Sequence, residues 1–288
     1  MPREGVTRAS RVSAVALTLV CVGLKPSASR ASAPKPSVDA SVTDEPQAVP
    51  SGSAPSGYPV KWSDQLGLAA LVDIEKQLRN VDATAFGELE LGGKRILPRS
   101  CVEWSRLHAA GYAPSTAVEV QPDGGARRRC ETLTLLSQAK PARQSFTRKL
   151  IFDKSILAIL PADLATRGSP DHDRDIALAT ENKRSLADFD PKAKVKRSVL
   201  PGVLEITEGG RQSSIAVEPM AWADFDGDGT DDVVVSVVNS MAHGSISNTR
   251  VIALTRSSNG EVLRLLALDK TASRPLPDAA VAGRPARE

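Results

Sequence analysis

The sequence is poor in the residues from which most active sites are built. Aromatic residues make up 3% of its 288 residues, and there are three histidines and three cysteines. So few rings supply poorly the exposed platforms on which sugars stack. There is also no Gly-x-Ser-x-Gly turn, no His-Glu-x-x-His helix, no phosphate-binding glycine loop and no Cys-His pair. These absences weigh against an enzyme, although a Ser-His-Asp triad needs only proximity in space.

The N-terminus has the pattern of a secretory signal peptide. Three arginines within the first eleven residues precede the apolar run 12–24, which is too short to span a bilayer, and small residues follow. We expect cleavage after Ala31, with Ala33 as a second option. A lipoprotein would need Cys21, which is disfavoured because a branched valine precedes it. The mature chain is expected to be periplasmic or secreted, with no transmembrane segment.

The mature chain has no marked excess of charge. Residues 1–31 contain five of the 37 Lys and Arg and one of the 34 Asp and Glu, which leaves 32 basic and 33 acidic residues and a net charge of −1. Nothing in this balance points to a nucleic acid or to an anionic membrane as a partner.

The two cysteines that remain after cleavage, Cys101 and Cys130, form an even pair in an exported chain. This predicts one disulfide. A metal pair or a nucleophilic thiol is disfavoured, because the cysteines lie far apart in the sequence and no histidine stands at ligand spacing.

Composition divides the mature chain into three parts. Residues 32–60 are mainly Ala, Ser, Pro, Val and Gly, which predicts a disordered linker, and the tail 272–288 has the same character. Residues 61–271 have the length of one domain or of two closely joined halves, and we expect a single domain. Helix and strand patterns alternate at its front and strands dominate its back. We therefore expect an α+β fold, with N-terminal helices and strands packed on an antiparallel β-meander.

The front of this domain predicts two helices, a turn and a hairpin. Ser63 is expected to cap a helix that reaches Leu78, and a second helix is expected over Ser100–Ala110, with His108 as a packing residue beside its buried face. Gln121–Gly125 has the composition of a turn. The predicted hairpin pairs 146–152 with 156–160.

The back of the domain predicts a run of strands with short connections. They are expected at Leu204–Thr207, Ser214–Val217, Val233–Val238, Arg250–Thr255 and Val262–Leu268. Three alternating lysines, Lys192, Lys194 and Lys196, indicate a charged edge strand, which discourages aggregation, more than an anionic partner.

Five aspartates occupy the nine positions 224–232, immediately before a run of valines. The spacing Asp-x-Asp-x-Asp-Gly-x-x-Asp suits Ca²⁺, which takes six to eight oxygens, and Gly229 stands where the loop must bend sharply. The alternatives are a solvated acidic turn, whose carboxylates would repel one another, and Mg²⁺, which fits so many anionic oxygens less well. The expected ligands are Asp224, Asp226, Asp228 and Asp232 with the carbonyl oxygen of Thr230.

The twelfth position of the loop is Val235, within a predicted strand, where an EF-hand needs a glutamate. The stretch Ala-Asp-Phe-Asp-Gly-Asp-Gly-Thr-Asp-Asp-Val-Val-Val resembles instead the calcium loop of FG-GAP and VCBS-type repeats, which form hairpin loops on integrin α-subunit propellers and on many bacterial secreted proteins. The resemblance implies calcium binding by the same five residues and covers about fifteen residues.

A propeller needs at least four related blades, and the chain has one such loop, so a full propeller is not expected. The only similar start, Ala-Asp-Phe-Asp at 187–190, continues with Pro191 and Lys192 and lacks the third carboxylate. More loosely, Cys101-x-x-Trp104, Gly111-Tyr112, Cys130, Ala-Lys-Pro-Ala at 139–142 and Leu-Thr-Arg at 254–256 resemble exported bacterial proteins that carry a single loop of this kind.

The function expected from these features is an exported calcium-binding module with a structural or partner-binding role. Its partner would be an unknown protein or envelope component. The alternative is a secreted hydrolase in which calcium only stabilises the fold and His172 or His243 takes part in catalysis.

Overall fold

A computed structural model describes residues 57–68, 70–79, 86–196, 202–209, 213–241 and 247–267. All of them belong to Ser53–Glu288, the second of two compact units into which the chain divides. The predicted signal peptide with Cys21, the tail 272–288, most of the predicted linker and His243 lie outside the described residues. The end of the linker region is described, and Tyr58 there exchanges backbone hydrogen bonds with Ala142.

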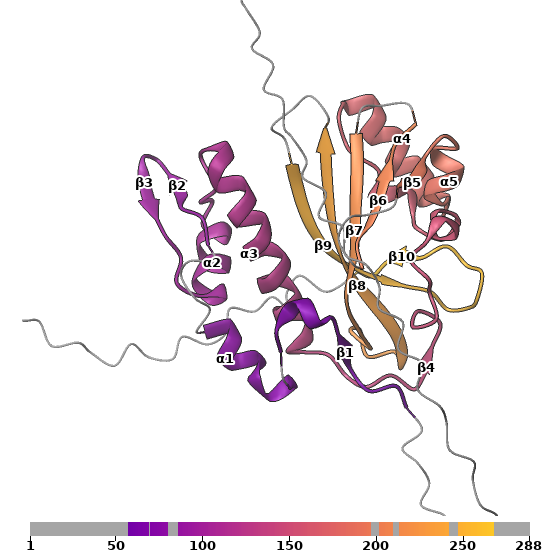
Figure 1. The fold of residues 1–288 in the computed structure, drawn as a ribbon, viewed down its shortest axis with the longest axis horizontal. Coiled ribbons are helices and arrows are strands. Elements are labelled where there is room, and N and C mark those ends of the chain that lie inside the picture. The colour runs from indigo at the N-terminus through magenta and orange to yellow at the C-terminus, as the bar shows by residue number, and fades with distance from the viewer. Residues whose placement is uncertain are drawn as a thin grey trace, which may run out of the picture. The chain divides into compact units, whose positions relative to one another are not determined.

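The fold is built on one sheet in which each strand of the C-terminal half pairs antiparallel with the next (Figure 1). These strands are β5 (Lys194–Lys196), β6 (Leu204–Thr207), β7 (Ser213–Ala223), β8 (Thr230–Met241), β9 (Ser247–Thr255) and β10 (Arg264–Leu265). Two short strands join them: β1 (Lys61–Trp62) lies antiparallel to β7, and β4 (Gln144–Ser145) lies parallel to β8. The predicted meander and the α+β class are confirmed.

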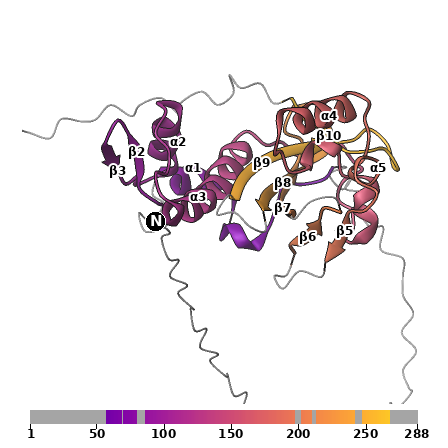
Figure 2. The same ribbon diagram turned by 90° about the horizontal axis from the view of Figure 1, so that it is seen from above.

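Two groups of helical segments pack against this sheet (Figure 2). The first contains η1 (Asp64–Leu66), η2 (Leu71–Asp73), α1 (Ile74–Arg79), α2 (Cys101–Ala109) and α3 (Ala117–Leu136), with a small hairpin of β2 (Leu89–Leu91) and β3 (Lys94–Ile96). The second contains η4 (Lys154–Ala158), η5 (Ala162–Leu164), α4 (Pro170–Glu181) and α5 (Leu186–Phe189). None of the described helices is long and apolar enough to cross a membrane.

The valine run lies in β8, which is buried on both faces. Val234 packs in the core formed with α1, α2 and α3, whereas Val233, Val235 and Val237 pack in the core formed with the second helical group. Successive side chains of a strand point to opposite faces, so a strand covered on both sides needs an unbroken apolar sequence. The residues that follow the acidic loop therefore form the central strand of the domain.

The predicted turn at Gln121–Gly125 is wrong, because these residues lie inside the helix α3. Thr116 and Glu119 form a capping box that starts this helix, and Pro122 stands in its second turn. Gly124 serves close packing: a Cβ on it would lie 2.7 Å from the Thr249 hydroxyl of β9. The glycine thus permits α3 to approach the sheet, which a turn prediction based on composition overlooks.

The predicted hairpin over 146–152 and 156–160 is also wrong. Residues 146–153 run without a strand, and the 3-10 helix η4 follows, capped by Asp153, whose side chain accepts a hydrogen bond from the Ser155 N–H. Tertiary burial of Ile156 and Leu157 fixes this segment as a helical turn. A short apolar run does not distinguish the two structures by itself.

Two other predicted segments are shorter than expected, and two are confirmed. The helix expected from Ser63 to Leu78 breaks at Gly67, which has a φ of 63°, into η1, η2 and α1. β10 is limited to two residues. The helix at Ser100–Ala110 is confirmed as α2, with the Ser100 side chain accepting a hydrogen bond from the Glu103 N–H. β5 is an edge strand with exposed lysines at both ends, as predicted.

The predicted disulfide joins Cys101 of α2 to Cys130 of α3. Both residues are buried, next to Trp104 and Leu133 in the first core. The covalent bond therefore joins the two helices. It also closes the segment between the two cysteines into a covalent loop, which restricts the unfolded chain.

We expect the double variant Cys101→Ala/Cys130→Ala to unfold with a free energy lower by about 3 to 4 kcal/mol, because the chain-entropy model assigns that stabilisation to a loop of this length. Chemical denaturation of the variant and of the oxidised protein measures the difference. Equal stability would mean that the bridge does not constrain the unfolded chain. Reductant should destabilise the unmodified protein and leave the variant unchanged.

Candidate metal centre

The aspartate-rich stretch forms the turn of the β7–β8 hairpin. The two strands pair from Ser213 with Met241 to Ala223 with Asp232, so residues 224–229 close a long hairpin. Gly229 has a φ of 88°, a left-handed conformation that residues with a Cβ rarely adopt. The sharp bend expected at this glycine is present.

Three carboxylates converge in this loop. Asp224, Asp226 and Asp232 each offer an oxygen that lies within 4.8 Å of the other two. Asp224 and Asp232 are buried and Asp226 is exposed. Asp228 is not one of this group, and its Oδ1 accepts a hydrogen bond of 2.6 Å from the Thr230 N–H. Oxygen ligands gathered from the beginning, middle and end of a short loop are what a hard divalent cation requires.

Backbone N–H groups shape the loop around these carboxylates. The Asp224 carboxylate accepts hydrogen bonds from Gly227 N at 2.6 Å and Gly229 N at 3.0 Å, and Asp226 accepts one from Asp228 N at 3.0 Å. Each carboxylate oxygen has two lone pairs, so these bonds leave capacity for a metal ion. The carboxylates therefore stabilise the loop conformation through hydrogen bonds and still have lone pairs available for a metal ion.

Asp232 has one carboxylate oxygen without a hydrogen-bond partner among the described residues. The residue is completely buried; its Oδ2 accepts a hydrogen bond of 3.0 Å from Phe225 N, while its Oδ1 has no hydrogen-bond partner in the described part of the chain. Burial raises the pKa of Asp232 to about 7; the Thr255 hydroxyl and the Phe225 N–H oppose this rise, and the charges of Asp226 and Asp228 add to it. A buried carboxylate in this condition must bind either a proton or a cation.

No ion pair among the described residues neutralises the loop. None of those with an N–O distance within 4.0 Å includes Asp224, Asp226, Asp228 or Asp232. Two cations lie against the loop backbone instead: a Cβ on Gly227 would be 3.6 Å from Lys140 Nζ, and one on Gly229 would be 2.9 Å from Arg143 Nε. Neither cation forms a salt bridge with a carboxylate among the described residues.

The segment 140–145 fixes the position of the loop. Lys140 and Asp224 exchange two backbone hydrogen bonds of 3.0 Å, and the Gly229 carbonyl accepts bonds from the N–H groups of Arg143 and Gln144. The Gln144 side-chain amide donates to the Thr230 hydroxyl at 3.1 Å. The expected ligand residues at both ends of the loop are therefore held by segment 140–145. No pattern in the sequence indicates this contact.

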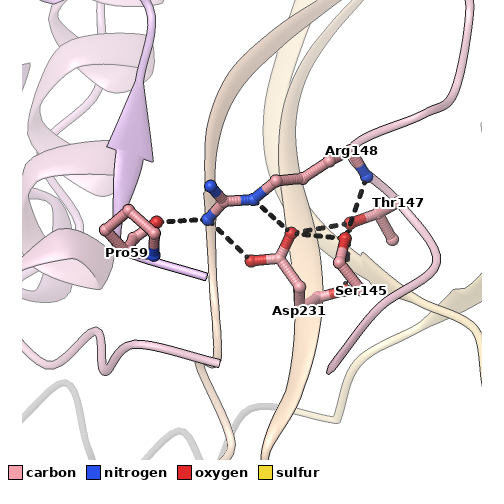
Figure 3. A network of polar contacts seen from close by, with 5 residues as sticks. All are labelled: Pro59, Ser145, Thr147, Arg148 and Asp231. Carbon is pink, nitrogen blue, oxygen red and sulfur yellow. Dashed lines mark hydrogen bonds and ion pairs between the residues drawn. The ribbon is translucent and has the colours of Figure 1, made fainter. Parts of the chain in front are cut away.

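The aspartate beside Asp232 has a different role (Figure 3). Arg148 contacts both oxygens of Asp231, with Nε 2.9 Å from Oδ2 and Nη2 3.1 Å from Oδ1. Ser145 and Thr147 also donate to Oδ2, and Arg148 donates to the Pro59 carbonyl. Asp231 is completely buried, so its charge depends on this bidentate pair.

The sequence indicates that one of the two adjacent aspartates needs a partner, but it does not indicate which residue is that partner. Adjacent aspartates entering a buried strand must point to opposite faces, so one of them needs a partner outside the loop. Nothing in the spacing identifies Arg148, which is 83 residues away. The contact depends on the irregular course of 146–153, where a hairpin had been predicted.

The histidines proposed for a hydrolase are not gathered at one described site. His172 lies on α4, with its ring 5.4 Å from that of Phe189, and His243 lies outside the described residues. His108 makes a hydrogen bond with Asp123 of α3 and thus does more than pack.

No family model matches this chain, and searches of curated proteins and of solved structures find no match. The candidate site therefore depends on the geometry of its own residues.

Asp232→Asn should abolish a calcium response without destabilising the calcium-free protein above pH 7, because it removes a buried charge whose Oδ1 has no hydrogen-bond partner among the described residues. Asp228→Asn should weaken the response less, because Asp228 lies outside the converging group. Thermal melting with calcium and with chelator measures both effects. A full calcium response in the Asp232 variant would exclude this carboxylate as a ligand.

Asp231→Asn should lower the free energy of unfolding by about 3 to 5 kcal/mol, because it leaves a largely buried guanidinium without its counter-charge. The matched control, Asp171→Asn, breaks an exposed pair with Arg174 and should change the stability by less than about 1 kcal/mol. Urea denaturation compares the two variants. Similar small losses would show that the Arg148 pair contributes no more than a surface pair.

Proposed function

We propose that this protein is an exported calcium-binding module with an FG-GAP/VCBS-like loop, and that it has a structural or partner-binding role. The ion would be held by the carboxylates of Asp224, Asp226, Asp228 and Asp232 and by the Thr230 carbonyl. The observation that carries the proposal is the buried Oδ1 of Asp232, which has no hydrogen-bond partner among the described residues although it belongs to a cluster of three carboxylates.

Calcium fits this cluster better than the alternatives. A proton neutralises only one carboxylate, and the two nearby cations, Lys140 and Arg143, make no ion pair with the loop among the described residues. Mg²⁺ demands near-ideal octahedral geometry and keeps several waters, whereas Ca²⁺ accepts many oxygens in an irregular shell. A short loop offering several carboxylates and a carbonyl favours the larger ion.

The structural role follows from what the loop contacts. Segment 140–145 is hydrogen-bonded to the loop, and Ala142 in the same segment is paired with Tyr58 near the start of the described chain. The loop also begins β8, whose side chains contribute to both cores. Calcium bound here would therefore stabilise the contacts between the N-terminal segment, segment 140–145 and the central hairpin.

The architecture favours a single domain with one calcium loop over a propeller with several. The meander carries helices on both faces, and the second Asp-Phe-Asp stretch forms the helix α5, in which Asp188 accepts hydrogen bonds from Ser185. We infer a periplasmic or secreted protein that uses one calcium-stabilised hairpin and is not a full propeller. Its partner would be a protein or another component of the cell envelope.

Calcium at about ten times its dissociation constant should stabilise the protein by about 1.4 kcal/mol, which corresponds to a rise in melting temperature of about 3 to 6 °C. At the same calcium concentration, the rise in melting temperature should be smaller at pH 6 than at pH 8. The folded calcium-free protein retains a proton on Asp232 up to about pH 7 that the unfolded chain loses near pH 4. Its stability therefore falls between these pH values, and calcium must displace the proton to bind.

Thermal melting of the purified protein at both pH values, with calcium, with magnesium and with chelator, tests this proposal. Below pH 7, the calcium concentration needed for half of the shift should increase about tenfold per pH unit. The absence of a shift at millimolar calcium and pH 8 would contradict a calcium site. An equal shift with magnesium would contradict the choice of ion.

A further inference from the structure

A second polar site lies at the other end of β8 from the calcium loop. β9 begins opposite that end, where Ser247 pairs with Ser240. Between the start of β9 and the helices α2 and α3 lies a cleft of about 270 Å³. Its polar lining includes His108, Asp123, Arg127, Ser247, Asn248 and Thr249. The volume of this cleft is slightly below that of most ligand pockets, so it would hold only a small molecule.

One carboxylate orients the histidine in this cleft. Asp123 Oδ1 lies 2.7 Å from Nε2 of His108 and accepts a hydrogen bond of 2.8 Å from Nε1 of Trp104. Burial would raise the pKa of Asp123, but the hydrogen bonds from His108 and Trp104 bring it below its ordinary value. Asp123 is therefore an acceptor only, and Nε2 of His108 must carry the hydrogen.

The other ring nitrogen of His108 is available to a ligand. Nδ1 has no hydrogen-bond partner among the residues that the structure describes, and it is not one of their buried unpaired atoms. Because Nε2 is bound to Asp123 and the ring packs on Trp104 with centroids 4.3 Å apart, its orientation is fixed. A fixed imidazole at the wall of a cleft presents Nδ1 for binding without further ordering of the side chain.

The remaining polar groups of the cleft are mainly donors. Arg127 lies 3.9 Å from Asp123 Oδ2 and has its guanidinium over the Trp104 ring. Ser247, Asn248 and Thr249 add two hydroxyls and an amide. Asp123 is the only carboxylate among the described lining residues, its side chain is 9% exposed, and it already accepts two hydrogen bonds. A ligand in the cleft would therefore meet a donor-rich surface, and the Asp123 carboxylate behind it is already bonded to His108 and Trp104.

We propose that this cleft binds a small organic carboxylate between His108 and Arg127, and that His108 takes up one proton at Nδ1 when the ligand binds. The protonated imidazole and the guanidinium would then donate charge-assisted hydrogen bonds to the carboxylate oxygens. The titratable and charged groups around His108 are Asp123 and Arg127 of α3 and, beyond Arg127, Glu131, whose Oε1 accepts a hydrogen bond of 3.1 Å from Arg127 Nη1. None of the residues that line the cleft belongs to the aspartate-rich loop.

The test is calorimetric titration of the purified protein at pH 8 with propionate, succinate and inorganic phosphate. Each titration is repeated in two buffers of different ionisation enthalpy. A carboxylate should bind with uptake of close to one proton per ligand. His108→Gln should bind at least about tenfold more weakly without proton uptake, and Arg127→Gln should also weaken binding. The matched control His172→Gln changes a histidine on α4 and should bind like the unmodified protein.

Nitrogen NMR of the histidine rings separates binding from a merely structural His108–Asp123 contact. The free protein should show His108 with hydrogen on Nε2 alone, and saturating carboxylate should protonate both nitrogens. Unchanged ring signals at millimolar carboxylate would overturn the proposal, as would unaltered affinity in His108→Gln. Binding of phosphate without any carboxylate would show that the ligand class is wrong.

Discussion

The structure depends on how two adjacent buried carboxylates are neutralised at the start of its central strand. Asp231 and Asp232 are both completely buried, and strand alternation directs them to opposite faces of β8. Asp231 has a bidentate partner in Arg148, whereas Asp232 has an oxygen with no hydrogen-bond partner in the described chain. Burying a charge is unfavourable unless it is compensated, so the second carboxylate requires a cation or a proton. The calcium proposal answers this requirement.

The surrounding fold makes this requirement strict. β8 lies in the middle of the meander, with helices against both faces, and its valines contribute to two cores. The strand cannot turn either aspartate toward water without moving its apolar neighbours by one position, which would reverse every side chain. Electrostatics at the loop and packing along the strand are therefore coupled. An ion at one end of the hairpin would help to fix the register of the whole sheet.

The sequence predicted the parts of this fold that follow from local patterns. The strands around β7 and β8, the helix capped by Ser100 and the disulfide partners have periodicity, capping or pairing signals that the tertiary structure retains. Prediction failed where tertiary contacts override composition. Gly124 looks like a turn residue but permits helix α3 to approach Thr249, and the apolar residues near Ile156 pack as a 3-10 turn. Candidate loop ligands were visible in the sequence, whereas Arg148 and the His108–Asp123 pair require the three-dimensional fold.

The most direct measurement of the central claim is anomalous X-ray diffraction from crystals grown with calcium. The account predicts one strong calcium peak in the β7–β8 loop, about 2.3 to 2.6 Å from Oδ1 of Asp232 and from the other ligand oxygens. A water molecule or a protein hydrogen-bond donor at Oδ1, with no calcium peak in the loop, would contradict it.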